Sequence, residues 1–79
     1  MRTPIMIPDF HLGDEPLRFG EWAVEVGDEI EAGETVAELI CPGLSLELVS
    51  SVAGVIAELS QAPDHLTYQG EIVGWIETG

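Results

Sequence analysis

The sequence predicts an all-β fold, in which one domain forms a two-sheet sandwich or flattened barrel with internal two-fold pseudo-symmetry. Apolar and polar residues alternate with a period of two in several short segments, as expected for strands with one buried face. Turn-forming residues separate these segments at the regular spacing of a sandwich or barrel. No segment has the apolar spacing of a helix over an ordinary helix length.

About seven or eight short strands are expected along the chain. The alternation is most regular at 22–26, 44–48 and 55–59, and each of these segments should bury one face. In the last of them, Val55, Ala57 and Leu59 are assigned to the same face. Apolar segments at 5–7, 17–19, 36–40 and 72–76 complete the set. The turns between strands are expected at Pro8-Asp9, Gly13-Asp14, Gly27-Asp28, Gly33-Glu34, Pro42-Gly43, Ser50-Ser51, Pro63-Asp64 and Gly70-Glu71.

The two halves of the chain repeat one pattern. The run Gly27-Asp28-Glu29-Ile30 matches Pro63-Asp64-His65-Leu66, and a turn glycine, Gly33 or Gly70, follows each run before an apolar strand. The spacing from Asp to Gly is five in the first half and six in the second, so the copies differ by one residue. Because neither half can bury its apolar face alone, we expect two four-strand copies packed face to face. The termini should then meet at the end opposite the Pro42-Gly43 turn.

Composition indicates one small folded domain over residues 1–79, since 46% of the residues are hydrophobic and 22% are charged. Fifteen Asp and Glu oppose only Arg2 and Arg18, which gives a net charge of −13. Such a surface repels nucleic acid and anionic membranes, so we expect neither as a partner. A protein partner should present a basic surface, unless the acidity serves solubility alone.

The single cysteine, Cys41, cannot form an internal disulfide, which fits a reducing compartment. No apolar run approaches the roughly 18 residues of a membrane span, and the first residues do not read as a signal peptide. We therefore expect a cytoplasmic protein.

The chain resembles the biotinyl/lipoyl carrier domains, and in particular the lipoyl domains of 2-oxo acid dehydrogenase acyltransferases. The resemblance covers nearly the whole chain and implies a flattened barrel of two four-stranded antiparallel sheets. It also implies lipoate or biotin on a lysine at the tip of an exposed hairpin. The motifs that carry the resemblance are Glu21-Trp22, Val26-Gly27-Asp28, Gly33, Val36-Ala37-Glu38-Leu39 and Val52-Ala53-Gly54-Val55.

The chain departs from this family at the lysine position. In the lipoyl pattern that the chain resembles, the modified lysine lies ten residues after the second turn glycine and eleven before the glycine of the later motif. Counting ten residues forward from Gly33 and eleven back from Gly54 leads to Gly43 in both directions. The chain contains no lysine, and an arginine guanidinium does not replace a primary amine. We therefore expect no lipoate or biotin, and we treat Cys41, Pro42, Gly43 and Leu44 as a vestigial attachment turn. Proline followed by glycine favours a type II turn here.

The remaining chemical candidates have stronger structural interpretations. Cys41 has no basic neighbour in sequence, so we interpret it as a small packed side chain rather than a reactive thiol. His11 and His65 do not have the spacing of metal ligands, and no serine has the surroundings of a nucleophile, so we expect no metal and no catalytic residue. Trp22 and Trp75 are expected in the core or at its rim, with an exposed interface anchor as the alternative.

The leading functional hypothesis is a non-enzymatic interaction or structural module related to the acyltransferase component of 2-oxo acid dehydrogenase complexes. Two alternatives remain. One is a working acyl or redox group carrier that uses Cys41 or non-covalent contacts. The other is a lipoyl-like adaptor domain of an export system, although four turn residues leave no room for the coiled coil that such adaptors insert.

Overall fold

The computed structural model describes residues 1–11 and 17–79, and the turn expected at Gly13-Asp14 lies outside them. This part of the chain forms eight strands. It contains no helix long and apolar enough to cross a membrane. The strands are β1 (Arg2–Met6), β2 (Leu17–Trp22), β3 (Glu29–Ile30), β4 (Thr35–Cys41), β5 (Leu44–Val49), β6 (Gly54–Leu59), β7 (Leu66–Thr67) and β8 (Ile72–Glu77).

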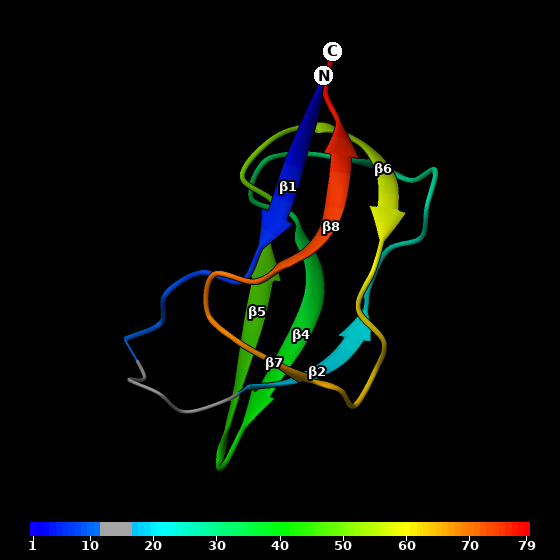
Figure 1. Ribbon diagram of the computed structural model, residues 1–79. Coiled ribbons are helices and arrows are strands. Elements are labelled where there is room, and N and C mark those ends of the chain that lie inside the picture. Colours follow the sequence, from blue (N-terminus) through cyan, green and yellow to red (C-terminus); the bar gives the residue numbers. More distant parts are fainter. Residues whose placement is uncertain (12–16) are drawn as a thin grey trace.

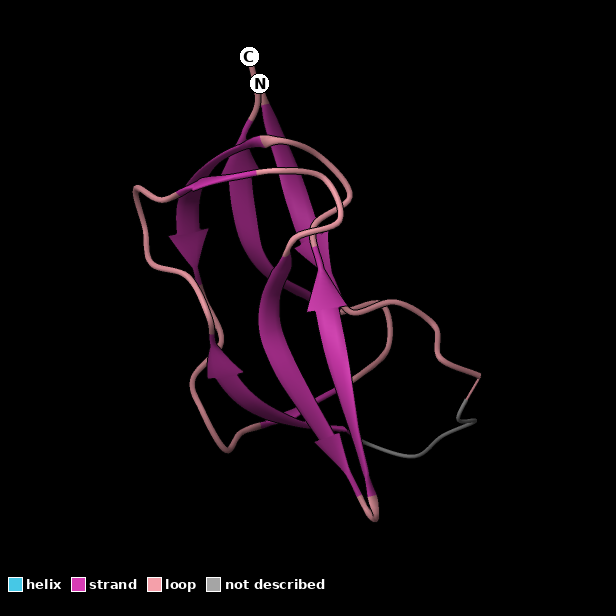
Figure 2. Ribbon diagram, turned by 180° about the vertical axis from the view of Figure 1, so that it is seen from behind, coloured by secondary structure: helices cyan, strands magenta, loops and turns pink. Residues whose placement is uncertain are grey.

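The strands form two four-stranded antiparallel sheets, ordered β1-β8-β6-β3 and β5-β4-β2-β7 (Figures 1 and 2). The two sheets have equivalent strand orders. The corresponding strands are four apart in the chain: β1 and β5, β8 and β4, β6 and β2, and β3 and β7. This arrangement confirms the predicted all-β fold of two packed sheets with two-fold pseudo-symmetry. The second half of the chain repeats the first.

The match between the halves differs by one residue from the sequence alignment. The Gly27 amide donates to Ile56, and the Asp64 amide donates in the equivalent way to Phe19. Both donors have a positive φ, 97° for Gly27 and 66° for Asp64. Asp64 is therefore the counterpart of Gly27 rather than of Asp28, and the spacing to the next turn glycine is six in both halves. Aspartate fits because it tolerates the left-handed region better than most non-glycine residues.

The expected strand at 22–26 is wrong beyond Trp22, where β2 ends. The chain turns at this point because the Asp28 carboxylate accepts the Glu25 amide at 2.9 Å, and the Asp28 amide donates to the Glu25 carbonyl at 3.0 Å. Val26 lies on this turn and is 62% exposed. Val26, the last apolar residue of the alternating pattern, is therefore a surface residue.

The face assigned to the strand at 55–59 is wrong at its start, although Leu59 packs against the core as expected. Ile56 is 1% exposed and faces the core, whereas Val55 is 38% exposed. A bulge between Ile56 and Glu58, opposite β8, shifts the alternation by one residue. Period-2 patterns cannot locate such a bulge, because the extra residue changes which side chains face inward.

One apolar core lies between the sheets and draws side chains from both. Its largest fully buried members are Phe19, Ile7, Leu17, Leu39, Leu48, Ile56 and Ile76. The Phe19 ring also contacts Trp22, with ring centroids 4.8 Å apart. The expectation that each four-strand copy forms one of the two packed sheets is wrong, because each sheet takes two strands from each half of the chain. Neither half is expected to be stable alone, since neither contains a complete sheet.

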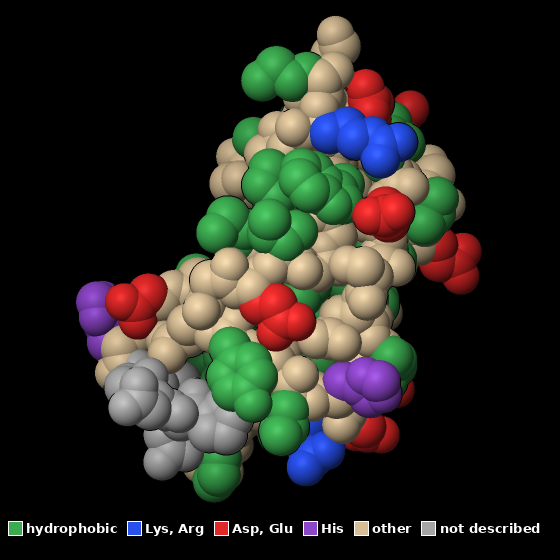
Figure 3. Space-filling model, in the orientation of Figure 1, with side chains coloured by type: hydrophobic (Ala, Val, Ile, Leu, Met, Phe, Trp, Pro, Cys, Tyr) green, Lys and Arg blue, Asp and Glu red, His purple; other side chains and the backbone are tan. Residues whose placement is uncertain are grey.

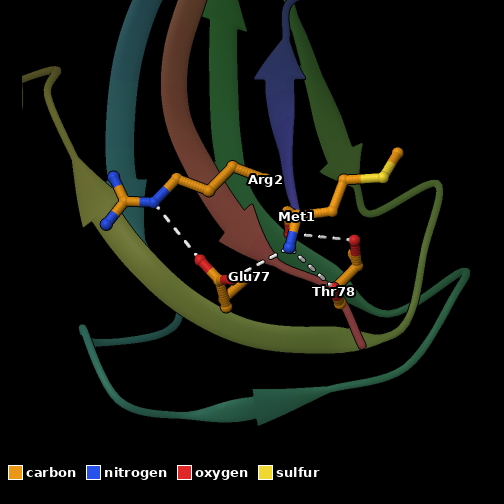
Figure 4. A network of polar contacts seen from close by, with 4 residues as sticks. All are labelled: Met1, Arg2, Glu77 and Thr78. Atoms are coloured by element: carbon orange, nitrogen blue, oxygen red, sulfur yellow. Dashed lines mark hydrogen bonds and ion pairs between the residues drawn. The ribbon is translucent and has the colours of Figure 1, made fainter.

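The termini meet at the pole opposite the β4–β5 hairpin, as predicted (Figure 1). Figure 4 shows the polar contacts that join them: the amino group of Met1 donates to Glu77 Oε1 at 3.1 Å, and Arg2 Nε donates to Glu77 Oε2 at 3.3 Å. The Thr78 amide donates to the Met1 carbonyl at 2.7 Å. The amino terminus, and after it Arg2, lower the pKa of Glu77 below its ordinary value of 4.5.

Replacing Glu77 by glutamine is expected to remove a small, pH-dependent contribution to stability. A lowered pKa in the folded state means that the ionised carboxylate favours folding above about pH 4.5 and that this contribution disappears as pH falls below it. The melting temperatures of wild type and Glu77→Gln should therefore differ near neutral pH and converge toward about pH 3. A constant difference at every pH would assign the effect to packing instead of charge.

Candidate functional site

The exposed tip of the β4–β5 hairpin is the first candidate site. Cys41 pairs with Leu44, so the turn consists of Pro42 and Gly43 (Figure 1). Gly43 has a φ of 76°, which fits the second central residue of a type II turn. A Cβ added to Gly43 would meet no atom within 4 Å. The tip thus ends in a compact turn with open space around it and no side chain at Gly43.

The residues beside this turn have different environments. Cys41 is half-buried and packs against the core, whereas Leu44 is 50% exposed. Ile40 is 39% exposed. Burial decreases along β5 toward the tip, because the hairpin extends beyond the body of the domain and has no opposing sheet there (Figure 2).

The outer face of the β5-β4-β2-β7 sheet is acidic. Glu38 and Glu47 are register partners on β4 and β5, and both side chains are exposed. Together with Glu21, these two residues line an open hollow on this face. Like charges directly opposite each other across strands are destabilising, so folding does not require this pair. No three His, Cys, Asp or Glu side chains of the described residues gather into a group that could hold a metal.

The other sequence candidates have local structural contacts. His11 is exposed and lies 3.8 Å from Asp9, while His65 is exposed on the turn before β7. Ser50 is buried, and its hydroxyl donates to the Val52 carbonyl and accepts the Val52 amide, which closes the turn before β6. Within the described residues, neither histidine forms a hydrogen bond or an ion pair with Cys41.

The two tryptophans differ: Trp22 lies at the rim of the core, as expected first, whereas Trp75 lies on an outer face, as in the alternative of a partly exposed anchor. Trp22 is half-buried against the core, and its Nε1 donates to the Gln61 carbonyl at 2.9 Å. Trp75 is half-buried but lies in register with Pro4 and Glu58 on the outer face of its sheet. Ile76, not Trp75, faces the core from β8. The position of Glu38 in the other half was the signal for this outward placement.

A protein-family model matches this chain over almost its whole length. The model described as "Biotin-requiring enzyme" matches residues 3–76.

Two curated relatives are acyltransferase components. The lipoamide acyltransferase component of the branched-chain alpha-keto acid dehydrogenase complex of Pseudomonas aeruginosa is 31% identical over 87% of this chain. The dihydrolipoyllysine-residue succinyltransferase component of the 2-oxoglutarate dehydrogenase complex of Staphylococcus saprophyticus is 44% identical over 49% of it. The matches cover only 16% and 9% of the lengths of these two relatives.

Solved structures share the fold. The solution structure of the lipoyl domain of the 2-oxoglutarate dehydrogenase complex from Azotobacter vinelandii covers 96% of this chain, with 96% of its own chain matched, a TM-score of 0.75 and 21% identity. The urea carboxylase of Kluyveromyces lactis covers 98% of this chain with 6% of its own length, at a TM-score of 0.81 and 17% identity. Two sheets in this arrangement therefore occur both as a separate domain and within a large enzyme.

Proposed function

The chain belongs to the biotin-requiring enzyme family of biotinyl and lipoyl domains, and we propose that it serves there as a non-catalytic interaction module that carries neither lipoate nor biotin. The observation that supports this proposal is the apex of the β4–β5 hairpin, where Pro42 and Gly43 form the turn. This tip is the place where the resemblance implies an attachment lysine. It ends in a residue without a side chain.

The residues present do not fit an amide-linked cofactor. Attachment as an amide requires a primary amine, and the chain contains no lysine. Its one other primary amine is the amino group of Met1, which lies at the opposite pole and contacts Glu77 at 3.1 Å. Arg18 is on β2, and its guanidinium donates to the Asp64 carbonyl. No step of a carrier cycle is therefore assigned to this domain.

The proposed partner is a protein with a basic surface, of the kind assembled in a 2-oxo acid dehydrogenase-type complex. The curated relatives named above are components of such complexes. A net charge of −13 attracts a basic surface over long distances and accelerates association at low salt. Binding to such a partner should accordingly weaken as the salt concentration rises.

Mass spectrometry of the purified chain after incubation with a lipoate or biotin ligase, ATP and the free acid tests the non-carrier role. The expected result is an unchanged mass, while a lysine-containing lipoyl domain in the same tube gains one cofactor. A gain of one cofactor mass on this chain would overturn the proposal. A mass gain in protein from the native host that a thiol reductant or hydroxylamine reverses would place a carried group on Cys41 and would overturn it equally.

A further inference from the structure

The outer face of the β1-β8-β6 part of its sheet carries an exposed apolar patch. One row across the three strands contains Pro4, Trp75 and Glu58, which are register partners. The next row contains Met6 and Ile72, which are 48% and 43% exposed. Figure 3 shows hydrophobic side chains gathered over β1 and β8, with acidic and basic side chains beside them. We call Pro4, Met6, Ile72 and Trp75 the Trp75 patch.

The fold itself does not require an apolar surface at this place. Trp75 and Glu38 are equivalent, because each lies five residues after the turn glycine of its half. The register partner of Trp75 is Pro4, and the register partner of Glu38 is Glu47. The same positions of the duplicated fold therefore hold two carboxylates in one sheet and two apolar side chains in the other. Exposed apolar patches that the fold does not require are typical of interaction surfaces.

The charges around the patch leave one carboxylate without a partner. Glu77 is neutralised by the amino group of Met1 and by Arg2. Glu58 is exposed and makes no ion pair within the described residues. Within the described residues, the Trp75 indole N–H also has no hydrogen-bond acceptor, whereas that of Trp22 donates to the Gln61 carbonyl. An indole ring and a free carboxylate thus lie in register on neighbouring strands.

From this arrangement we infer that the Trp75 patch binds an arginine side chain, flanked by apolar residues, of a partner protein. A guanidinium can stack on the Trp75 ring and pair with the Glu58 carboxylate at the same time. Met6 and Ile72 offer apolar surface to the residues beside that arginine. The inference rests on the proposed interaction role and names the surface and the chemistry through which the role is carried out.

Charge and area favour a different protein over a second copy of this chain. A second copy brings a further −13, and its exposed arginines are already engaged, Arg2 by Glu77 and Arg18 by the Asp64 carbonyl. A stable interface needs about 800 Å² from each partner, roughly a sixth of the 4727 Å² surface of this chain. Four partly exposed side chains supply only a fraction of that area, which fits a small contact in a transient complex.

A titration of the ¹⁵N-labelled chain with the peptide acetyl-Leu-Arg-Leu-amide tests the inference by NMR. The Trp75 indole N–H and the amides of Glu58 and Ile72 should shift and saturate, while the Trp22 indole stays in place as the internal control. The same peptide with citrulline in place of arginine keeps the shape without the charge and should bind more weakly. Higher salt should weaken only the arginine peptide.

Three variants sharpen the test. Glu58→Gln should raise the dissociation constant about two- to five-fold, as expected for an exposed ion pair. Glu21→Gln, at the equivalent position of the other sheet, should leave it unchanged. Trp75→Glu gives this sheet the side chain that Glu38 provides in the other, and it should abolish saturable binding. A melting curve of each variant shows whether the domain remains folded.

The outcomes separate this inference from the proposed function. Absence of saturable shifts, equal binding of the citrulline peptide, or shifts centred on Glu38 and Glu47 would each overturn the Trp75 site. None of these results changes the mass of the chain after ligase treatment. Conversely, a gain of cofactor mass would overturn the non-carrier role whether or not the arginine peptide binds at Trp75.

Discussion

The Gly43→Lys variant is expected to gain one cofactor mass when it is incubated with a lipoate ligase, ATP and lipoate, while wild type gains none. The substitution places a primary amine at the apex of the β4–β5 hairpin, beside Pro42. The space around the new side chain is open, since a Cβ at this position meets no atom within 4 Å. The expected effect is a change from no modified protein to a measurable fraction, read from the intact mass.

The new lysine must adopt a backbone conformation that glycine accepts more easily. Gly43 has a φ of 76°, and an L side chain there costs about 1–2 kcal/mol. The melting temperature of Gly43→Lys should therefore fall by several degrees, roughly 4–8 °C per kcal/mol for a domain of this size. That loss leaves the domain folded and able to act as a substrate.

A lysine one residue further along provides the matched control. Leu44→Lys introduces the same amine at a half-exposed position of β5, where Leu44 pairs with Cys41 instead of forming the turn. This variant should stay unmodified under the same conditions. Equal modification of both variants would show that the ligase does not read the apex. A folded but unmodified Gly43→Lys chain would show that more than the amine is missing.

Most of the architecture could be predicted from the sequence, because the buried strands are long enough to show their period. The segments at 36–40, 44–48 and 72–76 correspond to β4, β5 and β8 within about one residue. By contrast, β3 and β7 have two residues each and cannot show an alternation. No strand was predicted at either place, although turns were predicted on both sides of each.

For a related reason, the sequence could not predict which residues of the two halves correspond. Thr67, fully buried on β7, is the counterpart of the buried Ile30, whereas the apolar Leu66 is 52% exposed. An alignment by residue type selects Leu66, because a leucine resembles an isoleucine more closely than a threonine does. The hydrogen bonds of the turn decide the matter, and the positive φ of Asp64 is invisible in the residue order.

The candidate sites show the same division between local and non-local information. The turn at Pro42 and Gly43 follows from its two residues and was predicted. The Trp75 patch was missed because Pro4 and Trp75 are seventy-one residues apart and become neighbours only through the pairing of β1 with β8. The acid at the equivalent position, Glu38, indicates an outward side chain at Trp75 when the two halves are compared from Gly33 and Gly70 onward.

Replacing Phe19 by alanine is expected to cost about 3–5 kcal/mol of unfolding free energy, as for other fully buried aromatic residues. Phe19 is 0% exposed, and it is the largest of the fully buried side chains. Its ring packs on Trp22, and its backbone amide donates to the His65 carbonyl, which joins β2 to the turn before β7. A domain of this size has only about 4–12 kcal/mol in total, so the substitution should remove a large part of its stability.

Two single-tryptophan chains, Trp75→Phe and Trp22→Phe, show whether the two sheets share this loss. The remaining Trp22 reports on the sheet that contains Phe19, and the remaining Trp75 reports on the outer face of the other sheet. Because the two apolar faces form one core, Phe19→Ala should lower the urea midpoint by the same amount for both probes. Phe19→Leu, which keeps much of the buried volume, should lower it by less than half as much. A change seen only by Trp22 would mean that the sheets unfold separately, and the Trp75 patch would then keep its structure when the other sheet is lost.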